Sequence, residues 1–192
     1  MTTTEAEAQD QSDMGRLAAG HDAALNDLIA RHGARLYHYL LRVVQNDTDA
    51  ADIAEEAFVR VYQNRHKFRP ANKFSTWLYT IATNLARDVQ RRRTRHPQVS
   101  LEAEEHNFNE VLPADKPGPA ETMESAEIAH AVREAVAALP EELRLPLVLA
   151  EYEEKSHAEI GAILGCSPKA VEMRIYRARQ DLRARLASFY GK

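Results

Sequence analysis

The chain has 192 residues, of which 44% are hydrophobic and 28% charged, as expected for a soluble globular protein with one large or two small domains. No apolar run approaches the roughly 20 residues that span a bilayer, and the single cysteine excludes an internal disulfide framework and a multi-cysteine zinc site. The net charge of −4 does not exclude nucleic-acid binding, because residues 87–95 and 169–185 each carry +4, whereas negative charge is concentrated in 1–13 and 102–127.

Residues 1–19 are predicted to form a disordered acidic tail. The segment MTTTEAEAQDQSD has neither the basic and apolar regions of a secretory signal nor the arginine-rich composition of a transit peptide. We therefore expect a cytoplasmic protein. The sequence lacks a nucleophile–base pairing, a glycine-rich phosphate loop and a metal-ligand spacing, which predicts no enzyme activity, no catalytic residue, no metal and no cofactor.

A helical domain is predicted over residues 20–96, and its first informative segment is NDTDAADIAEEAFVRVY. Asp47 and Asp49 lie where negative charge favours the start of a helix. The helical spacing turns Ile53, Ala57 and Val61 toward the core. The opposite face carries three acids around one apolar residue: Asp52, Glu55, Glu56 and Val59. Such a face fits either a protein partner or simple solvation.

The second informative segment, KFRPANKFSTWLYTIATNLARDVQRRRTR, combines aromatic and basic residues. Pro70 predicts a loop with Lys67, Phe68, Arg69 and Lys73, and Ser75 or Thr76 is expected to cap the helix that follows. That helix would turn Leu78, Ile81 and Leu85 inward and Asn84, Arg87, Asp88 and Arg91 outward. Aromatic rings and cations together suit single-stranded nucleic acid. We favour this role for Phe68, whereas Phe74, Trp77 and Tyr79 fit a hydrophobic core.

Residues 97–124 are predicted to be a flexible acidic linker, because they contain four prolines and a glycine: Pro97, Pro113, Pro117, Gly118 and Pro119. Helical periodicity returns over 125–190, which predicts a second domain. No stretch alternates β-branched and polar residues, so the expected fold class is all-α, with two small helical domains joined by the linker. In the second domain, Pro140 is expected to start a helix in which Pro146 predicts a kink or a delayed start.

The segment SHAEIGAILGCSPKAVEMRIYRARQDLRARL predicts a helix-turn-helix. Ser156 and Glu159 have the spacing of a capping box, and Gly165 is suited to a tight turn. Ser167 can cap the second helix with Pro168 at its first position. Gly161 is small enough for a second helix to cross closely. The expected buried residues are Ile160, Ile163 and Leu164 in the first helix, and Val171, Ile175, Ala178 and Leu182 in the second.

The exposed face of the second helix is the candidate reader of DNA bases. It would present Lys169, Glu172, Met173, Tyr176, Arg177 and Gln180, with Arg174 and Arg179 at the flanks for phosphates. The first turns of such a helix enter the major groove, where side chains meet base edges. An ordinary helical hairpin with a polar outer face is the alternative.

Together these segments resemble the extracytoplasmic-function members of the sigma-70 family. DAADIAEEAF is similar to the polymerase-binding helix of region 2, FSTWLYTIATNLARD to its promoter-melting segment, and LPEELRLPLVL with the helix-turn-helix to region 4. The resemblance implies a non-catalytic subunit that directs RNA polymerase to promoters. Its region 2 would occupy 20–96 and its region 4 would occupy 125–190.

The resemblance also implies roles for individual residues. Asp52, Glu55 and Glu56 match the contacts to the clamp helices of the polymerase β′ subunit, and region 4 would meet the β flap. The −10 element would be recognised by Arg60, Asn64, Phe68, Arg69, Lys73, Ile81, Asn84, Arg87, Asp88 and Arg91. The −35 element would be read by Ser167, Lys169, Glu172, Met173, Arg174, Tyr176, Arg177 and Arg179. Sigma factors of this size are usually held inactive by an anti-sigma factor, so such a partner is expected.

Two alternatives stay open from the sequence. A helix-turn-helix transcriptional regulator that acts without docking on core polymerase would share the C-terminal segment, but it leaves FSTWLYTIATNLARD unexplained. Cys166, in the turn beside the reading helix, would fit a redox sensor, although a single thiol without a partner is more often a small apolar filler.

Overall fold

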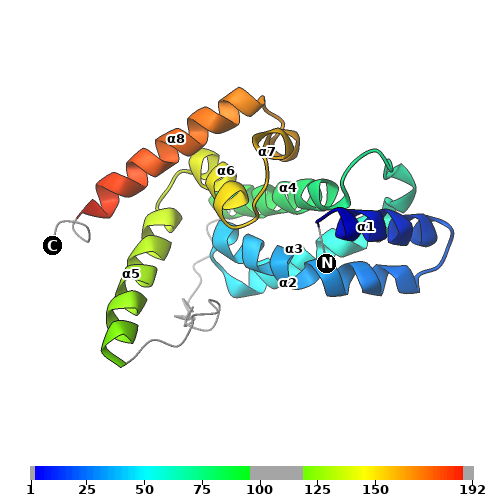
Figure 1. Ribbon diagram of the computed structural model, residues 1–192, viewed down its shortest axis with the longest axis horizontal. Coiled ribbons are helices and arrows are strands. Elements are labelled where there is room, and N and C mark those ends of the chain that lie inside the picture. The colour runs from blue at the N-terminus through cyan, green and yellow to red at the C-terminus, as the bar shows by residue number, and fades with distance from the viewer. Residues whose placement is uncertain (1–2, 96–118, 188–192) are drawn as a thin grey trace.

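The computed structural model describes residues 3–95 and 119–187, and within these ranges the chain is helical and contains no β-strand. We define the N-terminal module as α1 (Thr3–Ala18), α2 (Ala23–Val44), α3 (Asp47–Gln63), the 3₁₀ turn η1 (Arg65–Lys67) and α4 (Phe74–Arg95). The C-terminal module comprises α5 (Pro119–Ala137), α6 (Glu141–Glu151), α7 (His157–Leu164) and α8 (Pro168–Arg185). Figure 1 shows the two groups of helices. The all-α prediction is confirmed.

The first helix, α1, lies where the sequence analysis expected a disordered tail. It packs along α2, with Met14 and Leu17 buried against the core. Two of its acids are also buried, and both bind Arg31 of α2: Asp13 Oδ2 lies 2.7 Å from Nη2, and Asp10 contacts Nη1. His32 Nε2 lies 2.8 Å from Asp10 Oδ1. Asp10 and Asp13, which suggested a solvated tail, are therefore paired with Arg31 and His32 of the next helix, α2.

One helix start in the N-terminal module is as expected and another differs. Asp47 and Asp49 lie in the first turn of α3, as the sequence predicted. The side chain of Asn46 accepts a hydrogen bond from the backbone N–H of Asp49 and so caps α3. The prediction that Ser75 or Thr76 caps α4 is wrong, because this helix already begins at Phe74. The carbonyl of Lys73 accepts the first hydrogen bond, from the N–H of Trp77.

The predicted linker falls mostly outside the described residues, but its last part does not: α5 already begins at Pro119. Pro119 stands at the first position of this helix, where a missing N–H costs nothing. Pro146 does not delay the start of α6, which begins at Glu141 right after Pro140. Pro146 is instead accommodated inside the helix and is buried.

The helix-turn-helix forms as the sequence predicted. Ser156 and Glu159 make both hydrogen bonds of the capping box, and Gly165 ends α7 in the left-handed region at φ 69°. The side chain of Ser167 accepts from the N–H of Ala170, with Pro168 at the start of α8. The close approach at Gly161 comes from the turn rather than from the second helix. A Cβ on Gly161 would lie 2.6 Å from the carbonyl oxygen of Cys166.

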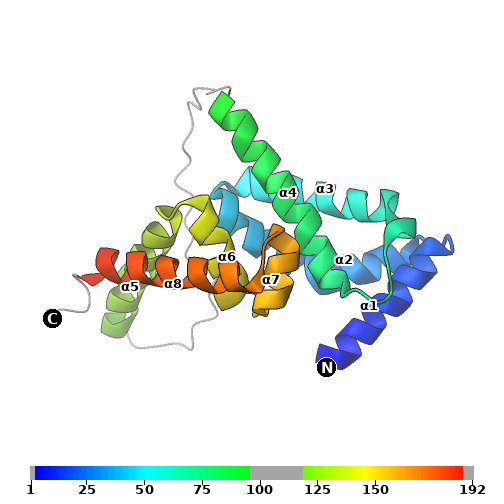
Figure 2. The ribbon, with the colours of Figure 1, turned by 90° about the horizontal axis from the view of Figure 1, so that it is seen from above.

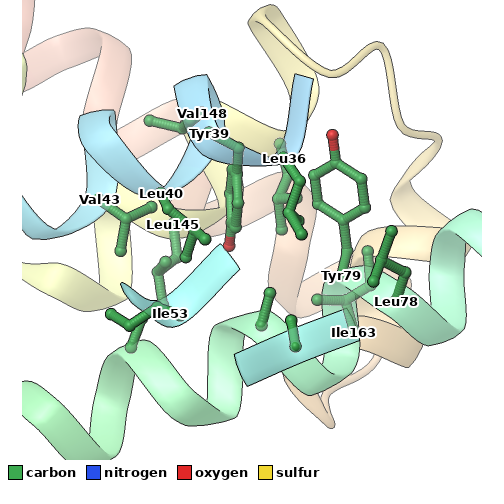
Figure 3. Close-up of a cluster of buried hydrophobic side chains, with 14 of the residues drawn as sticks. Leu36, Tyr39, Leu40, Val43, Ile53, Leu78, Tyr79, Leu145, Val148 and Ile163 are labelled. Carbon is green, nitrogen blue, oxygen red and sulfur yellow. The ribbon is translucent and has the colours of Figure 1, made fainter. Parts of the chain in front are cut away.

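The two modules pack directly against each other. Helix α6 lies on α2, and α7 lies on α4 (Figures 1 and 2). The close-up in Figure 3 shows Leu145 and Val148 of α6 among Leu36, Tyr39 and Leu40 of α2. One hydrophobic core therefore runs through both modules, which the sequence analysis, treating them as separate domains, did not predict.

Candidate nucleic-acid and protein interfaces

The exposed face of α8 collects the residues predicted to read bases. Met173 and Tyr176 are large hydrophobic residues, yet they are 42% and 57% exposed among the described residues. Lys169 Nζ donates to Glu172 Oε2 over 2.9 Å, and Gln180 Nε2 donates to the Tyr176 hydroxyl over 2.9 Å. The contact with Lys169 lowers the pKa of Glu172, so this carboxylate stays an acceptor at neutral pH. Val171, Ile175 and Ala178 are buried on the opposite face as predicted.

The two flanking arginines of α8, Arg174 and Arg179, differ in exposure and in the groups they contact. Arg174 is half-buried, and its Nη1 lies 3.5 Å from the sulfur of Cys166 in the turn. Arg179 is exposed but is held by Glu151, the last residue of α6, through Nε at 3.2 Å and Nη2 at 2.6 Å. A phosphate contact by Arg179 would therefore replace an existing ion pair.

Most residues predicted for the −10 element fall into two groups, one before α4 and one near the far end of α4. The first gathers where α3 ends and the loop leads into α4: Arg60, Asn64, Phe68, Arg69 and Lys73. The second comprises Arg87, Asp88 and Arg91 near the other end of α4, roughly 20 Å or more further along the helix axis. Ile81 and Asn84 lie between them. The ten residues thus form a long track rather than one pocket.

The loop before α4 is built around a cluster of aromatic rings. Phe68 is half-buried, with its ring centroid 5.4 Å from that of Trp77 and 6.2 Å from that of Phe74. Phe74 is 1% exposed and Tyr79 is 2% exposed, so both are core residues. The half-buried rings of Phe68 and Trp77 are the ones that leave area for a stacked base.

Polar contacts fix the shape of the same loop. Asn64 Nδ2 donates to the carbonyl of Arg60, and its Oδ1 accepts from Lys67 Nζ over 2.8 Å. Lys73 Nζ lies 2.6 Å from Glu7 on α1 and 3.2 Å from Glu159 on α7. Its bond to Glu7, followed by that to Glu159, raises the pKa of Lys73 and keeps it protonated. Arg87, further along α4, has its Nε 3.1 Å from Glu141 on α6.

An open apolar groove lies between α2 and α3, beside the predicted acidic face. It is lined by Leu25, Ile29, Gly33, Ala54, Glu55, Phe58, Val59 and Tyr62. Ile29 and Val59 are 39% and 40% exposed, and Asp52, Glu55 and Glu56 are exposed on α3. The sequence analysis identified the α3 wall but missed the α2 wall. The available signal was the spacing of Leu25, Ile29 and Gly33 by four residues along one helix face.

Residues 3–95 and 119–187 contain no group of three or more His, Cys, Asp or Glu side chains placed to hold a metal ion. None of their helices is both long and apolar enough to cross a membrane.

Comparison with known proteins assigns each module to a family model. Residues 28–96 match the model described as sigma-70 region 2, and residues 123–182 match the one described as sigma-70 region 4. The chain is 35% identical over 173 residues to the ECF RNA polymerase sigma factor SigW of Bacillus subtilis, covering 87% of this chain and 91% of that protein. It is 36% identical over 173 residues to ECF sigma factor SigE of Mycolicibacterium smegmatis, covering 88% of this chain but spanning only 65% of that longer relative.

Two solved structures share the fold of this chain over most of its length. CnrH, in complex with the cytosolic domain of CnrY, superposes with a TM-score of 0.68 at 29% identity, covering 94% of this chain and 98% of that chain. The sigma factor RpoE of Bartonella quintana, in complex with the anti-sigma factor NepR, also gives a TM-score of 0.68, covering 84% of this chain and 96% of that one. At 20% identity, the second likeness supports the fold alone.

Proposed function

The chain belongs to the extracytoplasmic-function (ECF) subfamily of sigma-70 RNA polymerase sigma factors, and we propose which of its surfaces carry each step of promoter-specific initiation. It is a non-catalytic subunit that directs transcription initiation to specific promoters. If the chain were a helix-turn-helix regulator that does not dock on polymerase, the match of residues 28–96 to sigma-70 region 2 would be unexplained. That alternative is therefore set aside.

Docking on core polymerase is assigned to the groove between α2 and α3. The observation that carries this assignment is the pairing of exposed apolar side chains, Ile29 and Val59, with a rim of exposed acids, Asp52, Glu55 and Glu56. An apolar ridge with basic flanks would complement this surface in shape and charge. We propose that the β′ clamp helices supply that ridge.

The docking proposal is tested by an Ile29→Ser/Val59→Ser double variant. Both side chains are exposed in the free chain, so folding should be unaffected. Loss of their burial should weaken core-polymerase binding about tenfold to hundredfold. Binding is measured by fluorescence anisotropy and function by run-off transcription with reconstituted holoenzyme. Ile128→Ser on α5, where the side chain is 43% exposed, is the matched control and should leave both readouts unchanged. Undiminished polymerase binding by the double variant would refute the assignment.

Promoter recognition is divided between the modules. We propose that Lys169, Glu172, Met173, Tyr176 and Arg177 on α8 read the −35 bases, while Ser167, Arg174 and Arg179 contact phosphates. The track from Arg60 to Arg91 would hold melted −10 DNA, with Phe68 as the stacking residue. The exposure of Met173 and Tyr176 on α8 supports the first assignment, and the aromatic cluster beside Arg69 and Lys73 supports the second.

Regulation by an anti-sigma factor is proposed as well, with the cytoplasm as the place where all these partners meet. The support is indirect: CnrH, which is 29% identical to this chain, was solved in complex with the cytosolic domain of another protein, CnrY. Affinity capture of the full chain from its native cell should recover a small protein in stoichiometric amount. Recovery of core polymerase without such a protein, together with constitutive promoter activity, would reject the proposal.

A further inference from the structure

Glu153 is a charged residue buried between the two modules. It lies in the loop between α6 and α7 and is 3% exposed. Both of its partners belong to the N-terminal module: Arg35 Nε on α2 at 2.9 Å, and the hydroxyl of Tyr79 on α4 at 2.5 Å. A buried carboxylate is stable only while it keeps such partners. Separating the modules would break both hydrogen bonds and leave the groups to be rehydrated.

Two groups near Glu153, the Tyr79 hydroxyl and the Lys155 ammonium, also take part in the contact between the modules. Burial against the carboxylate raises the pKa of Tyr79, which therefore remains a hydrogen-bond donor. Lys155 Nζ crosses the junction to Ser75 Oγ at 2.9 Å and lies 5.1 Å from the centre of the Tyr79 ring. By contrast, the neighbouring Glu154 has an 84% exposed side chain and approaches Arg35 Nη2 only to 3.7 Å. The loop thus inserts one of two consecutive glutamates into the junction.

Two further contacts across the junction occupy cations assigned to −10 DNA. Glu159, which lies in the helix-turn-helix itself, is 3.2 Å from Lys73, and Glu141 is 3.1 Å from Arg87. Lys73 also pairs at 2.6 Å with Glu7 of its own module, so separating the modules would remove one of its two carboxylates. DNA phosphates that bind Lys73 and Arg87, as proposed, would have to displace these carboxylates. Moreover, the −10 and −35 elements are separated by about 25 base pairs, or roughly 85 Å of duplex. A chain whose −10 loop touches its helix-turn-helix cannot engage both elements.

The connection between the modules permits their separation. Residues 96–118 join α4 to α5, and a segment of that length can reach roughly 75–80 Å when extended. We infer that Glu153, with Arg35 and Tyr79, forms a latch that holds the free protein closed and its −10 cations masked, and that this latch must open before both promoter elements are bound. The inference rests on the assigned DNA surfaces, but the closure itself can be measured without DNA or polymerase.

The latch is tested by energy transfer between dyes on the two modules. Ala19 and Ala184 are exposed and are replaced by cysteine in a Cys166→Ser background of the full chain. Glu153→Ala should lower transfer efficiency, with the open fraction rising at least about fivefold, because Tyr79 and Arg35 lose their acceptor. Glu154→Ala, the adjacent exposed acid, is the matched control and should leave the efficiency unchanged.

A second variant and a second readout make the outcome decisive. Arg35→Gln alters a half-exposed side chain on the other module and should also open the chain, even if Glu153→Ala fails to fold by circular dichroism. Both variants should bind a fluorescent single-stranded 12-mer of mixed sequence about fivefold more tightly than the control. Unchanged energy transfer in the folded latch variants would overturn the inference. Opening without tighter binding would overturn the masking of the −10 cations, whereas failed transcription by the wild type would count against the assigned function alone.

Discussion

At the scale of single residues, Gly161 shows how a close backbone approach fixes the geometry of the helix-turn-helix. The turn folds back over α7 and brings the carbonyl oxygen of Cys166 so close to Gly161 that there is no room for a Cβ atom at this position. The backbone N–H of Cys166 meanwhile donates to the carbonyl of Gly161 over 3.0 Å. Because backbone atoms stand on both sides of the contact, no flexible side chain can move to make room.

Gly161→Ala should therefore destabilise the protein although alanine is the better helix former. We expect a loss of about 1–3 kcal/mol in the free energy of unfolding, since overpacking outweighs the gain in propensity. Gly15→Ala in α1 is the control, because its Cβ would meet nothing within 4 Å and the substitution should stabilise by roughly 0.5–1 kcal/mol. Urea unfolding measures the change in the free energy of unfolding for both variants. A stabilising effect of Gly161→Ala would contradict the close contact.

At the scale of elements, the sequence predicted the helices whose ends carry local signals. The capping box of Ser156 and Glu159, three positions apart, marks the start of α7, and the adjacent Ser167 and Pro168 mark the start of α8; both helices formed as expected. No comparable signal marks α1, whose two buried apolar residues, Met14 and Leu17, give a weak stripe. Its buried acids Asp10 and Asp13 meet Arg31 only once α1 packs on α2, and Glu7 meets Lys73 beside α4, so these partners are invisible to local patterns.

The packing of α1 depends on Asp13, which is fully buried and binds both Arg31 and Arg16. Asp13→Ala should lower the free energy of unfolding by about 1.5–3 kcal/mol, because charge-assisted hydrogen bonds are lost and Arg31 keeps only Asp10. Asp27→Ala removes the other partner of Arg16, an exposed carboxylate at 3.4 Å, and should cost less than about 1 kcal/mol. Thermal unfolding compares the two. Equal losses would mean that α1 is not anchored through its buried acids.

At the scale of the whole molecule, the sequence predicted both modules but not their contact. Each module follows from periodicity, caps and breakers that lie within a few residues of one another. The junction instead pairs Arg35 with Glu153 and Tyr79 with the same acid, across more than 70 positions. The groove proposed for polymerase docking was predicted only in part for the same reason: the acids of α3 form one local face, whereas Leu25 and Ile29 join them only after α2 and α3 pack.

Two kinds of DNA contact are proposed on α8, to phosphates and to bases, and their dependence on salt concentration distinguishes them. A phosphate contact releases a counterion, so each one steepens the fall of log K with log salt by about 0.9, whereas a base contact does not. Arg174→Gln should therefore reduce the slope by about one for holoenzyme on any promoter duplex. Met173→Ala, one residue away on the exposed face, should leave the slope unchanged and instead change the ranking of duplexes that differ at −35.

The measurement uses promoter duplexes selected by transcription from genomic fragments with reconstituted holoenzyme, titrated at several salt concentrations. Circular dichroism checks that both variants keep their helices, since Arg174 also lies against the turn at Cys166. If Arg174→Gln altered the sequence ranking at constant slope, Arg174 would be a base reader. If Met173→Ala changed the slope with no effect on ranking, the exposed face of α8 would be a phosphate surface. The proposed roles require Arg174→Gln to change only the salt slope and Met173→Ala to change only the ranking of promoter duplexes.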